Sequence, residues 1–472
     1  MIAVGLWATS RNRSEADFFL GGRGLGPFVA GLSYAASTSS AWVILGFSGF
    51  VFTIGVSAVW MVPGIWAGYA VVWLYFGRRL REESRAHQQV TLTDFMLQDA
   101  PAKTRTRGLA TVLAAALVVF CFIFYVAAQL DAAGNALAEN FGMSVPSAII
   151  LGAVIVVFYS LLGGFWAVSI TDMVQAAIMM VVSVGVPVAA LVAAGGPAEV
   201  WTTLSASMPS GYLRLDGGHA SLVFLGFVVG LVGMSLGALG QPHLLSRLMA
   251  VRGEAERRQG YLITFAWGIV VFTGMVTLGL SGRALMPELA LPETLFYRAT
   301  SDYLPAIVAG VATAAVLSAV MSTVDSLLLA ASAAVAHDMG VNRRFPGREA
   351  MASRASVLGV AVFAVLLALS LPDTIFNRVL FAWSALGAAF GPVVLFRVAG
   401  HRVGANAALA VMAAGFATTV VFYTFGAMPP TDSMLSVAAH LPGDPFERVV
   451  PWLPGVAILL LTGLRRKQDA VA

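Results

Sequence analysis

Long apolar runs separated by short polar connections make up most of this chain. A run of about 20 apolar residues is enough for a helix to cross the roughly 30 Å hydrocarbon layer of a membrane. We therefore expect an all-α integral membrane protein with about twelve full transmembrane helices. The predicted spans are 27–54, 56–77, 108–134, 145–163, 165–194, 220–245, 259–282, 304–335, 353–371, 374–396, 404–426 and 449–464.

Composition agrees with this class and argues against an enzyme. Hydrophobic residues make up 58% of the chain and charged residues 11%, whereas soluble domains contain about 25% charged residues. The single Cys121 excludes a disulfide framework. The six His residues show no paired metal-ligand spacing, and we find no nucleophile elbow or phosphate-binding glycine loop. We expect no enzymatic activity and no organic cofactor.

The basic residues are unevenly divided between the two sides that these spans define. Since connections rich in Lys and Arg lie in the cytoplasm, the richer side is predicted to be cytoplasmic. This predicts a multi-pass protein of the cell inner (plasma) membrane with a cytoplasmic C-terminus. The net charge of +4 then reflects orientation, and neither a nucleic-acid partner nor an obligate protein partner is indicated. Of the 28 Lys and Arg residues, those on the poorer side are Arg214, Arg283, Arg298, Arg378 and Arg448.

Two predicted spans carry residues that interrupt a helix. In the first, residues 33–42 (SYAASTSSAW) form a polar patch. Proline removes a backbone donor, glycine weakens a helix, and unwound backbone at membrane depth is tolerated where it lines a cavity. Close packing between helices is the alternative explanation for glycines in a membrane. In the sixth span the interrupting residues are Gly230, Gly233, Gly237, Gly240 and Pro242.

Interruptions in spans one and six are typical of transporters built from two inverted five-helix repeats. We therefore predict a first repeat over 25–196 and a second over 197–400, followed by two additional helices and a short cytoplasmic tail over 401–472. Residues 1–24 remain. Their first eight are apolar but too short to span, and we interpret 1–24 as a truncated first helix and a cytoplasmic loop.

The eighth predicted span contains a polar face. Residues 319–326 (AVMSTVDS) place three hydroxyls and a carboxyl inside an apolar run. On a helix Ser322 and Ser326 lie one turn apart on the same face, with Thr323 and Asp325 beside them. Polar oxygens at this depth are costly without a partner, so they indicate an ion or substrate path. A hydroxyl bonded back to its own helix is the alternative.

Several segments resemble a known family of membrane transporters in the same order. They are 18–28 (FFLGGRGLGPF), 161–169 (LLGGFWAVS), 171–175 (TDMVQ), 240–243 (GQPH), 319–323 (AVMST) and 385–396 (ALGAAFGPVVLF). Together they resemble the sodium/solute symporter family, in its sodium/proline symporter branch. The resemblance implies a leucine-transporter-type 5+5 inverted-repeat helix bundle. That family has thirteen helices, which is consistent with a truncated first helix here.

The resemblance also implies a sodium site between spans one and eight. Sodium is a hard cation that prefers oxygen ligands. The family pattern implies backbone carbonyls of Ala36, Ser39 and Ala319 and hydroxyls of Ser322 and Thr323 as ligands. Every one of these positions can supply its oxygen.

A second cation site is suggested by Asp172, Asp325 and Ser326. In some relatives the aspartate that matches Asp172 lies on the sodium exit path or in a second sodium site. Asp172 could instead interact with the positive end of a helix dipole. Asp325 could be a protonatable group that gives proton coupling, or a paired structural charge.

Solute-binding candidates lie near the two interruptions. Aromatic rings give a small-molecule site its shape, while a few amides and hydroxyls fix orientation. Where the proline symporters carry an acidic residue and two large rings, this chain has Thr38, Met234 and Ala238. A larger amino acid or an organic carboxylate therefore fits at least as well as proline. The candidates are Thr38, Trp42, Tyr125, Gln129, Met234, Ala238 and Gln241, with Asp131 nearby.

The leading hypothesis is a sodium-coupled secondary active symporter that imports a small organic solute, such as proline or a related carboxylate, by alternating access. Its partners would be the solute, the sodium ion and the lipid bilayer. The alternatives are a proton-coupled symporter of the same fold, or a solute-sensing membrane protein without net transport. No pore loop or charged ring typical of a channel is present.

Overall fold

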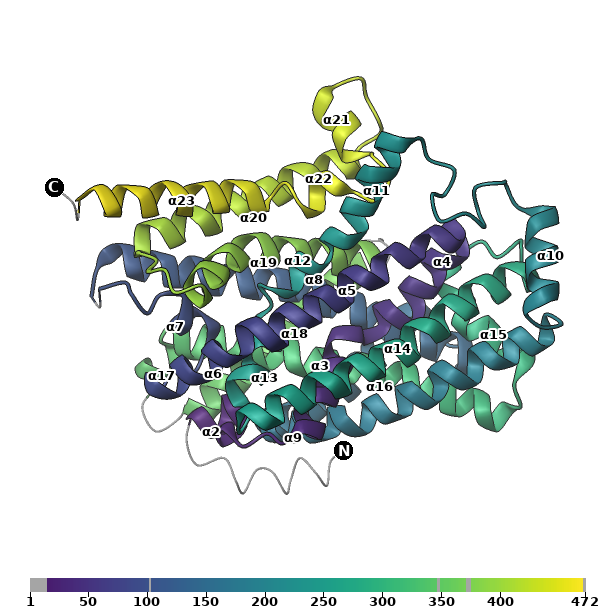
Figure 1. The fold of residues 1–472 in the computed structure, drawn as a ribbon. Helices are drawn as coiled ribbons and strands as arrows, with labels where there is room; N and C mark the ends of the chain where they lie inside the picture. Colours follow the sequence, from purple (N-terminus) through teal and green to yellow (C-terminus); the bar gives the residue numbers. More distant parts are fainter. Residues whose placement is uncertain (1–14, 102, 346–348, 371–374, 470–472) are drawn as a thin grey trace.

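The computed structural model describes residues 15–101, 103–345, 349–370 and 375–469. Figure 1 shows a bundle in which most helices run along one common direction. Ten helices in the described residues are long and apolar enough to cross a membrane, and Val145–Phe158 is a shorter apolar helix. The expected all-α membrane architecture is confirmed. The helix stub that we predict at residues 1–8 lies outside the described residues.

The first two predicted spans form one helical stretch of 60 residues, Pro27–Ala86. A straight helix of that length would measure about 90 Å, three times the hydrocarbon thickness. Gly55 divides it with φ +75° and ψ −147°, a conformation that residues with a side chain rarely adopt. The stretch contains α3 (Pro27–Ala41), the π-helical turn η2 (Trp42–Phe47), α4 (Ser48–Ile54), the 3₁₀ turn η3 (Gly55–Trp60), α5 (Met61–Ala70), η4 (Val71–Phe76) and α6 (Gly77–Ala86).

The next three spans are built from two very long helices. Within α9, Gly164 has φ +61° and ψ −177°, which breaks the helix between the predicted spans 145–163 and 165–194. The elements of this part are α2 (Glu15–Leu20), η1 (Gly21–Arg23), α7 (Leu92–Met96), α8 (Arg105–Phe141) and α9 (Val145–Ala193).

The sixth predicted span is broken into three pieces, and the remaining spans are nearly continuous. The elements from there to the end are α10 (Pro197–Ser207), α11 (Ser221–Gly233), α12 (Ser235–Ala238), α13 (Pro242–Ala250), α14 (Glu254–Leu285), η5 (Pro292–Thr294), α15 (Leu295–Tyr303), α16 (Ala306–Ala333), η6 (Ala334–Asp338), α17 (Val341–Arg344), α18 (Glu349–Ser370), α19 (Ile375–Val398), α20 (Ala405–Ala427), α21 (Met434–Ala439), α22 (Pro445–Arg448) and α23 (Trp452–Asp469).

The two ends of the bundle carry different elements. Figure 1 places α2, α6, α7, α13 and α17 at one end, which we call the arginine-rich end, and α4, α10 and α15 at the other. The last turns of α23 lie at the arginine-rich end as well. Helices α3 and α9 contact each other in the interior, and both contact α14 and α16. Every residue of α3 from Ser33 to Ala41 is buried.

Close approach of small residues holds several of these helices together, in agreement with the packing explanation for part of the glycines. Gly64 of α5 lies against the backbone of Val232 in α11, where an added Cβ would come within 2.7 Å of the Val232 Cα. Gly310 of α16 has no heavy atom within 4 Å of the place that a Cβ would take. The two positions differ in packing while both lie in apolar helices.

We predict that Gly64→Ala lowers the free energy of unfolding by about 1–3 kcal/mol, because overpacking forces backbone apart. Gly310→Ala is the matched control and should leave stability unchanged or slightly raised, since alanine favours helix more than glycine. Thermal unfolding of the purified proteins in detergent measures both. Equal melting temperatures for the two variants would contradict the close α5–α11 contact.

Candidate functional site

The interruption in α3 lies at Ser40, whose φ of 36° and ψ of −166° are not helical. Neighbouring groups hold this conformation. The N–H of Ala41 donates to Gln129 Oε1 of α8 at 3.1 Å, and the indole N–H of Trp42 donates to the Thr38 carbonyl at 2.8 Å. The N–H of Trp42 also donates to Ser40 Oγ at 3.3 Å. The predicted break in the first span is thus present, and α8 supplies a partner for it.

The second interruption lies between α12 and α13, where Gln241 is extended with φ −86° and ψ 107°. Gln241 Nε2 donates to the Trp383 carbonyl of α19 at 3.1 Å. The Trp383 indole in turn donates to the Met234 carbonyl at 2.9 Å. The ring lies so close to Gly237 that an added Cβ there would come within 1.9 Å of the indole. Trp383 therefore forms a wall beside this interruption.

The residues predicted to bind sodium lie on α3 and α16, which contact one another. Ser322 Oγ and Thr323 Oγ1 both donate to the Ala319 carbonyl, at 3.0 and 3.2 Å. Ser37 Oγ of α3 donates to the Ser322 carbonyl at 3.1 Å, so the two helices meet at this turn. Ser39 Oγ is buried and has no hydrogen-bond partner within the described residues. All five predicted ligands are fully buried: Ala36, Ser39, Ala319, Ser322 and Thr323.

A buried ion pair lies about one to two helical turns from this place toward the arginine-rich end. Arg247 Nη2 of α13 and Asp172 Oδ2 of α9 are 2.8 Å apart, with exposed side-chain fractions of 1% and 0%. Arg247 Nη2 also donates to Ser37 Oγ and Ser326 Oγ, both at 2.6 Å, and its Nε donates to Ser33 Oγ at 2.8 Å. One guanidinium therefore joins four helices, α3, α9, α13 and α16.

Asp172 lies about two turns past the Gly164 break. Because the field of a helix dipole falls off within the first turn, the dipole does not account for the burial of this carboxylate. Ser33 Oγ donates to Asp172 Oδ2 at 2.7 Å, while Oδ1 is buried without a hydrogen-bond partner in the described part of the chain. The structure brings Asp172 and Ser326 together around Arg247, and Asp325 Oδ1 accepts from Ser326 Oγ at 3.4 Å.

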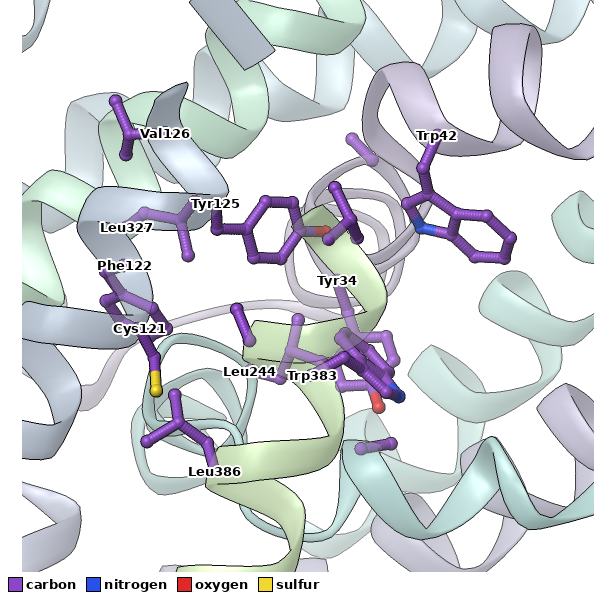
Figure 2. Packing of buried hydrophobic residues seen from close by; sticks show 14 of the residues in the cluster. Tyr34, Trp42, Cys121, Phe122, Tyr125, Val126, Leu244, Leu327, Trp383 and Leu386 are labelled. Atoms are coloured by element: carbon purple, nitrogen blue, oxygen red, sulfur yellow. The ribbon is translucent and has the colours of Figure 1, made fainter. Parts of the chain in front are cut away.

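Most of the predicted solute-binding residues surround the α3 break. Figure 2 shows Tyr125 extending from α8 toward α3, with Trp42, the first residue of η2, beyond it. Tyr125 Oη lies 3.5 Å from Ser40 Oγ. Gln129 Nε2 is buried without a partner among the residues described. Thr38 Oγ1, in contrast, donates to the Tyr34 carbonyl of its own helix.

The remaining candidates have structural partners. Met234 and Ala238 lie on the segment covered by Trp383, and the indole hydrogen bond to the Met234 carbonyl holds that segment to α19. Asp131 of α8 pairs with Arg378 of α19 at 2.8 Å.

A polar cluster at the arginine-rich end was not expected from His spacing. Asp94 of α7 and His337 of η6 are 3.0 Å apart (Oδ2 to Nε2), and Thr91 Oγ1 donates to Asp338 Oδ1 at 2.8 Å. The three side chains of Asp94, His337 and Asp338 lie close enough to hold a metal ion. Burial raises the pKa of Asp94, but His337 and the backbone N–H groups of Val90 and Thr91 lower it more, so it stays below its ordinary value.

Sequence reasoning missed Arg247 and Trp383. The division of basic residues places Arg247 on the richer, cytoplasmic side, where an exposed side chain is expected, yet this side chain is buried. The available signal was its position within an apolar stretch, residues 244–251 (LLSRLMAV), directly after the interrupted span. Nothing in the local sequence marks Trp383, because its contact with Gly237 joins residues far apart in the chain.

The sequence of this chain matches a known protein family. The sequence model of the Sodium:solute symporter family matches residues 18–415. The osmoregulated proline transporter OpuE of Bacillus subtilis is 31% identical to this chain, covering 98% of this chain and 92% of its own length. The sodium/proline symporter of Escherichia coli is 33% identical over 439 residues, with 90% of this chain and 86% of its own length covered.

A solved structure confirms the fold class. The substrate-bound outward-open state of a Na⁺-coupled sialic acid symporter superimposes with a TM-score of 0.77 over 98% of this chain and 94% of that one, at 15% sequence identity. The chain has the leucine-transporter-type fold that the motifs implied.

We predict that Gln129→Leu destabilises the protein by about 1–3 kcal/mol, because it leaves the buried N–H of Ala41 without an acceptor. Gln175→Leu is the control. Gln175 is equally buried, but neither atom of its amide has a hydrogen-bond partner in the described residues, so its replacement should be neutral or stabilising. Thermal unfolding in detergent compares the two. A Gln129→Leu protein as stable as Gln175→Leu would show that α8 does not support the break.

Proposed function

The chain belongs to the sodium:solute symporter family and is a sodium-coupled importer of a solute, and we propose that this solute is a small amino acid such as proline or a related organic carboxylate. Sodium entry would drive import of the solute against its concentration gradient. The membrane potential contributes about 2.3 kcal/mol of free energy per charge per 100 mV, and the sodium concentration gradient adds to this. Alternating access to a fixed site between the two broken helices would couple the two movements.

The sodium site is proposed at the contact between α3 and α16. One observation carries this assignment: an interrupted helix lies directly against the only turn of α16 where two adjacent hydroxyls converge on one carbonyl, that of Ala319. A hydroxyl that donates its proton to a carbonyl keeps its lone pairs for a cation. The ligand set is Ala36, Ser39, Ala319, Ser322 and Thr323.

The solute site is proposed beside the break, between α3, α8 and the α12–α13 interruption. Gln129 offers an amide N–H₂ group with no other partner within the described residues, a donor suited to a carboxylate. Trp42 and Tyr125 supply rings on one side, and Trp383 supplies a ring beside Met234 on the other. Met234 and Ala238 leave space where the resemblance implies two large rings, and Trp383 fills part of that space. This supports a compact solute. The relatives named above are proline transporters.

The orientation and the repeat division are part of the same proposal. The arginine-rich end would face the cytoplasm, in keeping with the distribution of Lys and Arg, and the C-terminus would lie on that side. The two repeats would be 25–196 and 197–400. The breaks at Ser40 and Gln241 lie in the first span of each repeat, which supports this division.

We predict that Ser322→Ala combined with Thr323→Ala abolishes sodium-stimulated solute uptake into proteoliposomes, since it removes both side-chain ligands of the proposed cage. Thr313→Ala is the matched control: Thr313 lies on the same helix, and its hydroxyl donates to the Ala309 carbonyl in the same way, at 3.1 Å. This control should retain sodium dependence. Full sodium dependence in the double variant, with the protein folded, would remove the assigned cage.

The same assay separates sodium coupling from proton coupling. Uptake driven by an inward pH gradient without sodium would indicate the proton-coupled alternative. Binding of solute without any uptake under either gradient would indicate the sensing alternative.

We also predict that compact amino acids raise the melting temperature of the purified protein only when sodium is present. A ligand at 100 times its Kd stabilises the folded state by about 2.7 kcal/mol. A screen of amino acids and small carboxylates, with sodium chloride compared with choline chloride, measures this. Stabilisation by bulky amino acids alone would contradict the wall assigned to Trp383.

A further inference from the structure

Arg247 is a cation held inside the membrane-spanning bundle rather than at its surface. Its side chain is 1% exposed. Besides the contacts described above, its Nη1 donates to the His243 carbonyl of its own helix. Buried charges in membrane proteins are expensive and are found where they are paired or serve a function. Here the pairing is with Asp172, and the place is next to the proposed sodium cage.

The oxygens around Arg247 are those that a second cation would need. A single nitrogen, Nη2, lies 2.8 Å from Asp172 Oδ2 and 2.6 Å from Ser37 Oγ and from Ser326 Oγ. Asp172 and Ser326 are two of the three residues that the sequence suggests for a second cation site. A carboxylate with two hydroxyls is also a typical oxygen set for a hard cation. The guanidinium therefore lies where the metal ion would lie.

The surroundings would admit an ion if the guanidinium were absent. Asp172 Oδ1 is buried without a hydrogen-bond partner among the described residues. A cavity of about 40 Å³ begins at Arg247 and Ser326 and extends past Leu329 to Thr91 and Asp338 at the arginine-rich end. Since a water molecule requires about 10–15 Å³ of such space, this cavity has room for water beside the cluster.

We propose that the guanidinium of Arg247 is the resident cation of the second site, so that the protein binds a single sodium ion, at the α3–α16 cage. Two effects exclude a second sodium ion. The nitrogen occupies the space between the three oxygens, and its positive charge repels another cation at contact distance. The proposal rests on the proposed sodium site for the total count, but the role of Arg247 is tested separately below.

The test is the number of sodium ions bound per protein, measured by equilibrium binding of radioactive sodium to the purified full-length chain. We expect one ion for the wild type and two for Arg247→Gln, a doubling, because Asp172 becomes available. Arg247→Lys keeps the charge and should bind one. The double variant Arg247→Gln/Asp172→Asn should also bind one, because the carboxylate is gone.

Arg257→Gln is the matched control for loss of a buried arginine. Arg257 of α14 is 3% exposed and pairs with Glu254 at 2.6 Å, not with Asp172. The Arg257→Gln variant should therefore bind one ion. Two ions in the wild type, or a folded Arg247→Gln protein that binds no more ions than the wild type, would overturn the proposal. If Arg247→Gln does not fold, the wild-type count decides: one supports the proposal and two overturns it.

The same ion counts test the α3–α16 cage separately from the role of Arg247. No ion in the wild type together with one in Arg247→Gln would support the role of Arg247 while refuting the α3–α16 cage. One ion in the wild type that is lost in the Ser322→Ala/Thr323→Ala protein would support both.

Discussion

An interrupted helix inside a membrane persists only if its freed backbone groups find partners, because lipid offers none. In α3 one of these partners comes from another helix, and the others come from residues beside the break. Gln129 of α8 accepts from the N–H of Ala41, and the Trp42 indole donates to the Thr38 carbonyl. Ser40 is held at positive φ between them, a conformation that costs about 1–3 kcal/mol. The contact with α8 therefore maintains the break, and a shift of α8 relative to α3 would alter the backbone that the proposed sodium and solute sites share.

Two ion pairs, one buried and one partly buried, join helices of the two proposed repeats. Asp172 of α9 pairs with Arg247 of α13, and Asp131 of α8 pairs with Arg378 of α19. In each pair the carboxylate comes from the first proposed repeat and the guanidinium from the second. A buried pair is a weak source of net stability, whereas an unpaired buried charge is strongly destabilising. Each pair thus connects the two proposed repeats, and separating either pair would require water or another ion to replace the lost partner.

The parts of this structure that sequence alone predicts are local in the chain. Spans are visible because length and apolar content are properties of a single segment, and the breaks at Ser40 and Gln241 are visible because glycine, proline and clustered hydroxyls mark them.

The burial of Arg247 could not be predicted from the sequence, for a physical reason. A lone arginine beside a predicted connection has the composition of a cytoplasmic charge, and only the approach of Asp172, 75 residues away in the chain, makes its burial possible. The cluster of Asp94 and His337 joins residues 243 apart and was missed for the same reason.

Trp383 illustrates how a third helix can complete a site that two broken helices begin. Met234 and Ala238 carry no ring in the sixth span, and the space beside Gly237 is filled by Trp383 from α19. This arrangement requires glycine at 237, because any Cβ there would overlap the indole. It also ties the extended segment at Gln241 to α19 through the Trp383 carbonyl. The wall of the proposed solute site and the interruption in the sixth span are therefore both attached to α19. Since α19 also carries Arg378, displacement of that single helix would change the solute site and the Asp131 ion pair together.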